Sequence, residues 1–483
     1  MTAASTLEPV ASADALVHDA FATLKTGWEE AGGLSYAQRM DALSRLLDAT
    51  RRWEGRIADA IDADFGARSR HETAMAEVFV LVAHIKYLQK HLKSWMKPSR
   101  RHVDMLFRPA RNMVVYQPLG VVGVIAPWNY PFQLAMVPLA SALAAGNRVL
   151  IKPSEIAPRT ADVMTELVAE LFSPRVVGVV TGGPEVGIAF SRLPFDHLFF
   201  TGSTGVGRHI MRAAAEHLVP VTLELGGKSP TIVHGDFPIA KAAERTAVGK
   251  LLNAGQTCIA PDYVLCPRDQ VDAFVDAFSE VVRRCYPTLA DNPDYTAIVN
   301  EAHYRRVAGY VAEAQAADVR TVEINPAGEA LAPEARKLAP TLIIDPPDSL
   351  RVMQDEIFGP VLPIVPYDRL DDAIRYVNER PRPLALYYFD RDRERVRRVL
   401  HETVSGGVAV NDTMLHIAQD DMPFGGVGPS GMGAYHGREG FEALSHRKSV
   451  FRQARINTVG LLLPPYGSKV DRLLDFMIGR KKA

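Results

Sequence analysis

Five short apolar runs alternate with helix-like segments between residues 121 and 225. The runs are VVGVIA (121–126), RVLIK (148–152), VVGVV (176–180), HLFF (197–200) and VTLEL (221–225). A run that is apolar at nearly every position is typical of a strand covered on both faces. Strands separated by helices form βαβ units whose strands are parallel. This region therefore predicts an α/β fold built on a doubly wound parallel sheet.

The flanking regions predict further units. Apolar residues recur at spacings of three and four through residues 13–95, which indicates helices. Residues 97–118 break this pattern with prolines and alternation, so we expect an extended arm or hairpin there. From about residue 226 to residue 415, strand-like and helix-like segments alternate again. The length of 483 residues also exceeds what one ordinary core supports.

Composition excludes several classes of protein. The 55 Lys and Arg residues nearly balance 56 Asp and Glu residues, so no electrostatic footprint for nucleic acid is present. Three cysteines without a CxxC or Cys/His cluster argue against a disulfide scaffold and against a zinc site, and no metal is expected. No apolar stretch reaches the ~20 residues of a membrane span, and the N-terminus lacks a secretory pattern. We therefore expect a cytoplasmic protein.

Two glycine clusters compete as the phosphate-binding turn of a nucleotide site. GVGPSG (426–431) matches the spacing GxGxxG, but no buried strand precedes it and no helix start follows it. FFTGSTGVGRHI (199–210) departs from that spacing, yet it follows a buried strand and opens a helix. A helix N-terminus directs backbone N–H groups at an anion. The second cluster, with Gly202, Ser203, Gly205 and Gly207, is therefore the better candidate.

Seven motifs occur in one order along the chain: PWNYPF (127–132), KPSE (152–155), FTGSTGVG (200–207), LELGGKSP (223–230), GQTC (255–258), EIFGP (356–360) and PFGGVGPSGMG (423–433). Together they resemble the NAD(P)-dependent aldehyde dehydrogenase superfamily over essentially the full length. The short N-terminus and the segment GMGAYHGREGFEALSHRKSV resemble its class-three branch, which includes fatty, aromatic and coniferyl aldehyde dehydrogenases, the last of these being the nearest group.

The resemblance implies three catalytic residues. Cys258 would attack the aldehyde carbonyl as a thiolate to give a thiohemiacetal. The Cys258 backbone N–H and the Asn129 amide would stabilise its oxyanion, at roughly 3–4 kcal/mol per donor. Glu224 would activate the water that hydrolyses the resulting thioester, which requires a raised carboxyl pKa. Tyr130 is expected either to line the substrate tunnel or to pack, with the tunnel favoured, whereas Cys266 is expected in the core.

The resemblance also implies the cofactor contacts. Trp128 and Phe358 would lie near the nicotinamide, Glu356 at its ribose, and Lys152 with Glu155 at the adenosine ribose. Gly202, Ser203, Gly205 and Gly207 would meet the pyrophosphate. A carboxylate at the 2′-hydroxyl disfavours a 2′-phosphate, so NAD is favoured, although Lys152 partly offsets this and NADP is possible.

The implied organisation is an aldehyde-dehydrogenase-like fold. Residues 1–96 and 119–225 would form the dinucleotide-binding domain, 226–415 the catalytic domain, and 97–118 with 416–483 an oligomerisation arm and C-terminal segment. We expect a homodimer. The apolar residues of the C-terminal segment predict a terminal helix that packs on the protein or on a partner subunit, a membrane-surface anchor being the less favoured alternative.

The expected reaction is oxidation of an aldehyde to its carboxylate, with aromatic aldehydes such as coniferaldehyde first and medium-chain aliphatic aldehydes second. Two alternatives remain. In a CoA-acylating aldehyde dehydrogenase, coenzyme A accepts the acyl group, but such branches usually lack a base at the position of Glu224. A non-catalytic scaffold would be expected to have lost Cys258, Asn129 or Glu224, and all three are present.

Overall fold

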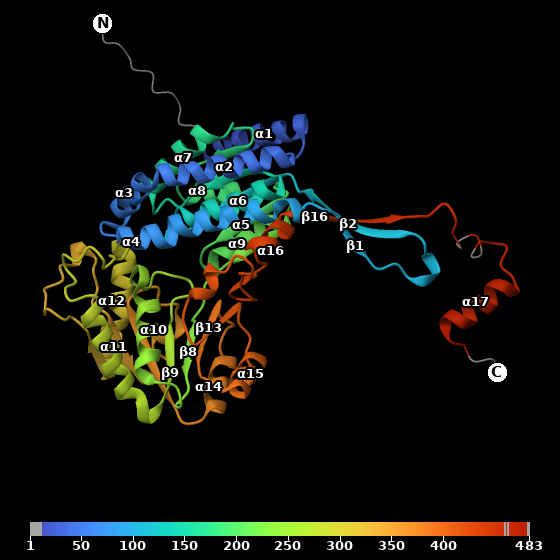
Figure 1. The fold of residues 1–483 in the computed structure, drawn as a ribbon. Coiled ribbons are helices and arrows are strands. Elements are labelled where there is room, and N and C mark those ends of the chain that lie inside the picture. The colour runs from blue at the N-terminus through green and yellow to red at the C-terminus, as the bar shows by residue number, and fades with distance from the viewer. Residues whose placement is uncertain (1–11, 458–459, 461–462, 481–483) are drawn as a thin grey trace, which may run out of the picture.

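Three β-sheets organise the chain, and the computed structural model describes residues 12–457, 460 and 463–480 of it. Residues 1–11 of the predicted dinucleotide-binding domain and residues 481–483 of the predicted C-terminal segment lie outside the described residues. Two sheets with their helices form the upper and lower parts of the body in Figure 1, and the third forms an arm that projects to one side. The predicted α/β fold is confirmed.

The first sheet has six strands in the order β15-β7-β6-β3-β4-β5. Their bounds are β3 (Val121–Ile125), β4 (Arg148–Lys152), β5 (Val177–Val179), β6 (His197–Thr201), β7 (Val221–Glu224) and β15 (Gly431–Met432). The five predicted strands pair in parallel. The sixth, β15, comes from the glycine-rich segment near the C-terminus and pairs antiparallel with β7, placing Gly431 opposite Glu224.

Helices cover both faces of this sheet, which explains its wholly apolar strands. Along β3, Val122 and Val124 point into one hydrophobic cluster while Val121 and Ile125 point into another, as the alternation of a strand requires. The first face is covered by α2 (Tyr36–Arg52), α3 (Glu54–Phe65), α5 (Val80–Trp95), α6 (Gln133–Ala145) and α7 (Pro158–Leu171). The second is covered by α1 (Ala13–Ala31), α8 (Pro184–Ser191) and α9 (Thr204–Ala215).

The second sheet has seven strands in the order β10-β11-β12-β9-β8-β13-β14, and all its pairs except β10 with β11 are parallel. Its strands are β8 (Pro230–Val233), β9 (Tyr263–Pro267), β10 (Thr321–Glu323), β11 (Thr341–Ile344), β12 (Val361–Tyr367), β13 (Ala385–Phe389) and β14 (Gly407–Val410). Cys266 is fully buried in β9, so its predicted place in the core is confirmed.

The helices of the second sheet also divide between its faces. One cluster holds residues of α10 (Ile239–Leu251) and α11 (Val271–Cys285); another holds residues of α12 (Glu301–Ala316), α13 (Arg351–Gln354), α14 (Leu370–Asn378) and α15 (Arg393–Glu402). Shorter helical segments are α4 (Arg70–Thr73), η1 (Ala74–Phe79), η2 (Met105–Phe107), η3 (Leu252–Gly255), η4 (Arg268–Gln270), η5 (Pro333–Ala335), η6 (Leu415–Ala418) and α16 (Gly437–Ala443).

The arm is an antiparallel sheet of β1 (Ser99–Arg101), β2 (Arg111–Pro118) and β16 (Ser445–Arg452), with β2 in the middle. The predicted hairpin over 97–118 is therefore confirmed, and β16 joins it from the far end of the chain. Figure 1 places α17 (Ser468–Ile478) beyond the tip of the arm. None of its residues is buried, so the expected packing of this helix on the body of its own chain is not found.

None of the helices in the described part of the chain combines the length and apolar character needed to span a bilayer.

Candidate active site

One cavity of about 370 Å³ gathers loops that follow strands of the first sheet and loops of the second sheet unit. Trp128 and Asn129 follow β3, Gly202 follows β6, and Glu224 ends β7. The carboxyl ends of parallel strands share one sheet edge, which is where α/β folds bind ligands. The predicted residues that line this cavity are Trp128, Asn129, Gly202, Ser203, Glu224, Cys258, Glu356 and Phe358.

Cys258 lies just after η3 and is half-buried at the cavity wall. Burial, and after it the negative charges of Glu356 and Glu224, raise the pKa of its thiol to about 12. The backbone N–H groups of Cys258 and Ile259 act in the opposite direction because they favour the thiolate. The resting side chain is therefore a neutral thiol at pH 7, which requires a base or a bound ligand for activation.

Glu224 is buried at the end of β7, and neither of its carboxyl oxygens has a hydrogen-bond partner among the described residues. Burial raises its pKa well above the ordinary value. An unpartnered buried carboxyl is costly and marks a group that awaits a ligand or a water. Such a carboxyl can take up a proton at neutral pH.

Asn129 presents a side-chain amide beside Cys258. One N–H of its Nδ2 donates to the carbonyl of Gln256 at 3.1 Å, and the amide has a second N–H to offer. Tyr130, in contrast, is buried away from the cavity, and its hydroxyl bonds to Thr257 Oγ1 at 2.7 Å. Tyr130 therefore does not line this cavity, and its contacts correspond to the packing alternative.

Glu356 has the chemistry of a ribose ligand. Burial and the charge of Asp262 raise its pKa to about 8, and its Oε1 has no hydrogen-bond partner in the described part of the chain.

The turn after β6 brings its backbone close to neighbouring side chains. A Cβ on Gly202 would lie 2.5 Å from the Phe200 ring. Ser203 caps α9 by accepting a hydrogen bond from Val206 N. These features fit a dinucleotide.

Four predicted cofactor residues do not line this cavity: Lys152, Glu155, Gly205 and Gly207. Lys152, the last residue of β4, donates from Nζ to Glu155 Oε2 at 2.6 Å. Burial would raise the pKa of Glu155, but the hydrogen bond and charge of Lys152 outweigh it and lower that pKa. A Cβ on Gly207 would lie 2.7 Å from Leu225 Cδ2, whereas Gly205 has open space around it. Gly207 therefore serves close packing between α9 and the segment after β7.

Sequence patterns missed the wall that α12 contributes, with His303, Arg306 and Tyr310. The His303 ring lies 4.8 Å from the Trp128 ring, and burial together with Arg306 lowers its pKa to about 4. Arg306 Nη1 donates to Ile357 O at 2.9 Å and to Glu356 O at 3.2 Å. The spacings of three and four put these side chains on one helix face, but only the tertiary fold shows that the face meets the site.

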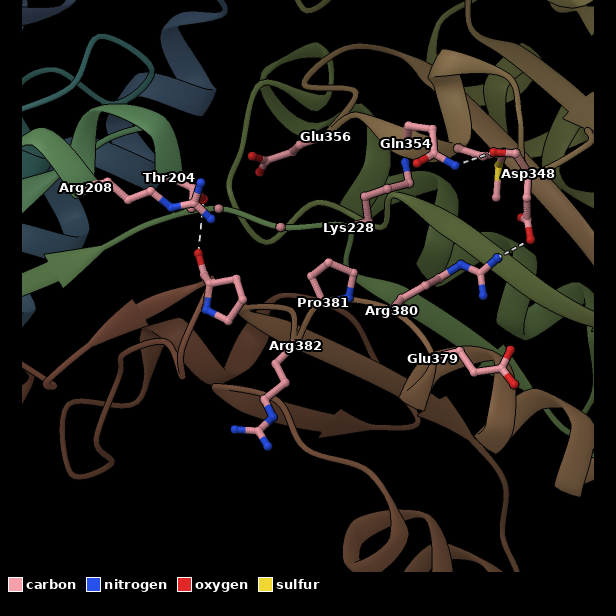
Figure 2. Close-up of a pocket in the computed structure, with 14 residues that line it drawn as sticks. Thr204, Arg208, Lys228, Asp348, Gln354, Glu356, Glu379, Arg380, Pro381 and Arg382 are labelled. Carbon is pink, nitrogen blue, oxygen red and sulfur yellow. Dashed lines mark hydrogen bonds and ion pairs between the residues drawn. The ribbon is translucent and has the colours of Figure 1, made fainter.

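A larger cavity of about 560 Å³ adjoins the first, and Gly226 and Glu356 line both. Its walls come from α9 and from residues 348–356 and 379–382, so it lies between the two sheet units (Figure 2).

The glycine-rich segment near the C-terminus packs against the first sheet unit. Thr204 Oγ1 donates to Pro429 O at 3.0 Å, which connects α9 to this segment. That segment packs its backbone closely, since a Cβ on Gly431 would lie 2.3 Å from Leu223 O. The interpretation of GVGPSG as a packing loop is thereby confirmed.

A family model, described as the aldehyde dehydrogenase family, matches residues 3–450. This chain belongs to the aldehyde dehydrogenase family. It is 54% identical over 437 residues to a probable coniferyl aldehyde dehydrogenase of Pseudomonas aeruginosa, covering 90% of this chain and 91% of that protein. It is 40% identical to aldehyde dehydrogenase family 3 member A2 of Pongo abelii, covering 92% and 90%.

Among solved structures, a Staphylococcus aureus AldH in a substrate-bound state matches with a TM-score of 0.90 and 39% identity, covering 95% of this chain and 99% of that one. The family and the class-three-like branch predicted from the motifs are confirmed. The protein is an NAD(P)-dependent aldehyde dehydrogenase that oxidises an aldehyde to its carboxylate. The scaffold alternative is therefore set aside.

Proposed function

We propose that Cys258 is the nucleophile of this aldehyde dehydrogenase, that Asn129 and the Cys258 N–H stabilise the oxyanion, and that Glu224 is the base. The observation that carries the proposal is the convergence of these residues on one cavity in which both Glu224 oxygens are partnerless. Glu224 accepts a proton as the Cys258 sulfur adds to the carbonyl carbon. The second N–H of Asn129 then donates to the new oxyanion.

The same carboxylate serves the second half of the reaction. NAD(P), when bound, accepts the hydride of the aldehyde carbon. A thioester on Cys258 remains. Glu224 then releases to solvent the proton that it took from the thiol, removes a proton from the water that attacks the thioester carbonyl, and passes that proton to the departing Cys258 sulfur, so that the carboxylic acid leaves and the thiol is restored. The presence of this base favours hydrolysis over transfer to coenzyme A. If product formation requires added coenzyme A, the hydrolytic proposal is wrong.

We propose an aromatic aldehyde such as coniferaldehyde as the substrate, with medium-chain aliphatic aldehydes second. Support comes from the similarity to the probable coniferyl aldehyde dehydrogenase of Pseudomonas aeruginosa and from the aromatic wall of the cavity, where the Trp128 ring lies 5.4 Å from the Phe358 ring. Aromatic side chains pack favourably against an aromatic ring. Values of kcat/KM across a panel of aromatic and aliphatic aldehydes test the order, and a preference for the aliphatic members would reverse it.

We propose that residues 1–96 and 119–225 form the dinucleotide-binding domain and 226–415 the catalytic domain, and that NAD is preferred while NADP is accepted. The partnerless Oε1 of Glu356 supports the binding of ribose hydroxyls, and the Lys152–Glu155 pair supports a place for the second ribose. A carboxylate there repels a 2′-phosphate. The ratio of kcat/KM for the two cofactors tests the preference, and Glu155→Gln should shift the ratio towards NADP.

We propose a homodimer in which residues 97–118 and 416–483 form the oligomerisation arm and C-terminal segment. The arm projects from the body, and Phe451 on β16 is half-exposed. Strand β14 leaves an open edge at one end of the second sheet, and open edges favour pairing with another chain. Light scattering on a sizing column should give twice the mass of 53.0 kDa. A monomer at micromolar concentration would contradict the proposal, and Phe451→Asp should weaken the dimer.

A further inference from the structure

Two buried charged side chains from the amino-terminal helical segment reach the catalytic loops. Arg68 lies just before α4 and Glu72 lies within it, and both are almost fully buried. Burying charges costs free energy unless each finds partners. The side-chain hydrogen bonds of both residues go to distant segments of the chain and not to the backbone of α4.

The Arg68 side chain makes one hydrogen bond within the described part of the chain, from Nη1 to the backbone carbonyl of Asn129 at 3.0 Å. Its Nε and Nη2 have no hydrogen-bond partner among the described residues. The guanidinium lies between the Phe65 ring at 4.8 Å and the Tyr130 ring at 5.0 Å, and Glu72 Oε2 is 4.0 Å away. Two aromatic rings, the Glu72 carboxylate and the charge of the buried Glu77 therefore surround this cation, whose side-chain hydrogen bond goes to a single carbonyl, that of Asn129.

Glu72 holds the turn that leads to Cys258. Asn253 and the next residue, Ala254, both have positive φ, at 52° and 50°. Two consecutive residues with a Cβ in this region are strained and persist only where surrounding contacts enforce them. The Glu72 oxygens accept from the Asn253 N–H at 3.1 and 3.2 Å, and Glu72 Oε2 also accepts from Thr296 Oγ1 at 2.8 Å.

The two contacts join in one network around the proposed oxyanion hole. Asn253 Nδ2 donates to Asn129 O at 3.0 Å and to Gln256 O at 3.1 Å, and Asn129 Nδ2 donates to the same Gln256 carbonyl. Hydrogen bonds to the carbonyls of Asn129 and Gln256 thus link the loop that bears Asn129 to the loop that bears Cys258. Arg68 donates to the first of these carbonyls, and Asn253 donates to both. Arg68 and Glu72 do not line the cavity themselves.

We propose that Arg68 and Glu72 are positioning residues that hold the Asn129 amide and the turn before Cys258 in register, so that the two oxyanion donors converge on one point. The proposal rests on the proposed roles of Asn129 and Cys258. Small displacements of groups that must converge in the transition state cost up to about 100-fold in rate.

The first experiment compares Arg68→Met with Arg39→Met. Arg39 is a matched control because it is also buried in the first sheet unit and also donates to backbone carbonyls, those of Leu34 at 2.7 Å and Ala144 at 3.0 Å. We expect Arg68→Met to lower kcat about 10- to 100-fold per folded protein. We expect Arg39→Met to lower the melting temperature while kcat stays within about twofold. An equal kcat for the two variants would overturn the role of Arg68.

A double-mutant cycle with Asn129→Ala separates positioning from general damage. If Arg68 acts through the amide, then Arg68→Met should cost less than about threefold in kcat once that amide is absent. An undiminished loss in the Asn129→Ala background would overturn the proposal. Full activity of Asn129→Ala alone would instead contradict the proposed role of Asn129. If Arg68→Met does not fold, Arg68→Lys replaces it, because lysine keeps the positive charge and a hydrogen-bond donor. We expect the kcat of Arg68→Lys to lie below that of the wild-type enzyme. A wild-type kcat for Arg68→Lys would overturn the proposal.

Glu72 is tested by Glu72→Gln with Asp64→Asn as its control. Asp64 is a carboxylate of the same unit that accepts from the backbone N–H groups of Arg159 and Thr160, each at 2.9 Å, away from the cavity. We expect Glu72→Gln to lower kcat about 10-fold while KM for NAD stays within about twofold, and Asp64→Asn to leave both unchanged. A Glu72→Gln variant with wild-type kcat, or with a loss confined to KM for NAD, would refute the proposal.

Discussion

Cys258 in the resting enzyme should react slowly with an alkylating agent, and its rate should climb with pH without a plateau below pH 10. The reason is burial beside two carboxyl groups, which raises the thiol pKa from the ordinary 9.0 to about 12. Only the thiolate attacks iodoacetamide. A rise of about three pKa units lowers the thiolate population at pH 7.5 by about 1,000-fold.

The slower reaction is partly offset because a more basic thiolate is a better nucleophile. With a Brønsted coefficient of about 0.45, three units of basicity raise the intrinsic rate by about 20-fold. The net expectation is alkylation about 50-fold slower than that of an exposed cysteine at pH 7.5. The slope of log rate against pH should be close to one from pH 7 to pH 10.

The assay follows iodoacetamide addition by intact mass in a Cys285→Ser background. Cys285 is exposed and would otherwise consume the reagent, whereas Cys266 is buried in β9. The Cys285→Ser, Cys258→Ala protein is the control and should show almost no labelling. A rate that levels off between pH 6 and pH 8 would mean that the resting enzyme already holds a thiolate, which would refute the electrostatic reasoning.

Three further predictions concern the same cavity. Glu224→Gln should form the thioester slowly, because the thiol loses its base, and should hydrolyse it more slowly still, so intact mass should reveal an acyl adduct that builds up on Cys258 over a long incubation. Rapid turnover without an adduct would contradict its role as base. Glu356 has a pKa of about 8, so its carboxyl loses a proton as pH rises from 7 to 9, and the carboxylate accepts ribose hydroxyls better. The affinity for NAD, measured by calorimetry, should therefore rise over this range in the native enzyme and stay flat in Glu356→Gln. Gly207→Ala should lower the free energy of unfolding in urea by about 1–3 kcal/mol, because the added Cβ meets Leu225. Gly205→Ala should change that free energy by less than about 0.5 kcal/mol, because the space around Gly205 is open. Equal effects of the two substitutions would show that crowding at α9 does not constrain the turn.

The strands of the first sheet could be predicted because helices cover both faces, so every position of β3 had to be apolar. The family resemblance implied that Glu224 and Asn129 act together, and the structure places both at the carboxyl ends of parallel strands, where α/β folds bind ligands. A short apolar run without periodicity indicates burial but does not distinguish a strand from a buried helical segment. The segment YVLCP was therefore recognised as core, while its place as a central strand, β9, was not.

The remaining parts of the site depend on contacts between distant segments. His303 reaches Trp128 across 175 positions of sequence, and Arg68 reaches Asn129 across 61. No local pattern distinguishes a buried arginine that holds a loop from one on a solvated helix face, because both occur in the same charged surroundings in sequence. The signal lies only in the tertiary packing.

The pairing of β15 with β7 has a consequence for the synthesis of the enzyme. The strand that ends in Glu224 acquires its outer neighbour only when Gly431 has been made, about two hundred residues later. Until then, the edge of β7 is unpaired, and the backbone carbonyl that Leu225 N–H bonds in the native protein, that of Ser430, does not exist. A growing chain therefore carries its nucleophile before its base is held in place. Aldehyde oxidation should begin only after nearly the whole polypeptide has left the ribosome, and a chain that stops short of residue 430 should be inactive even if Cys258, Asn129 and Glu224 are all present.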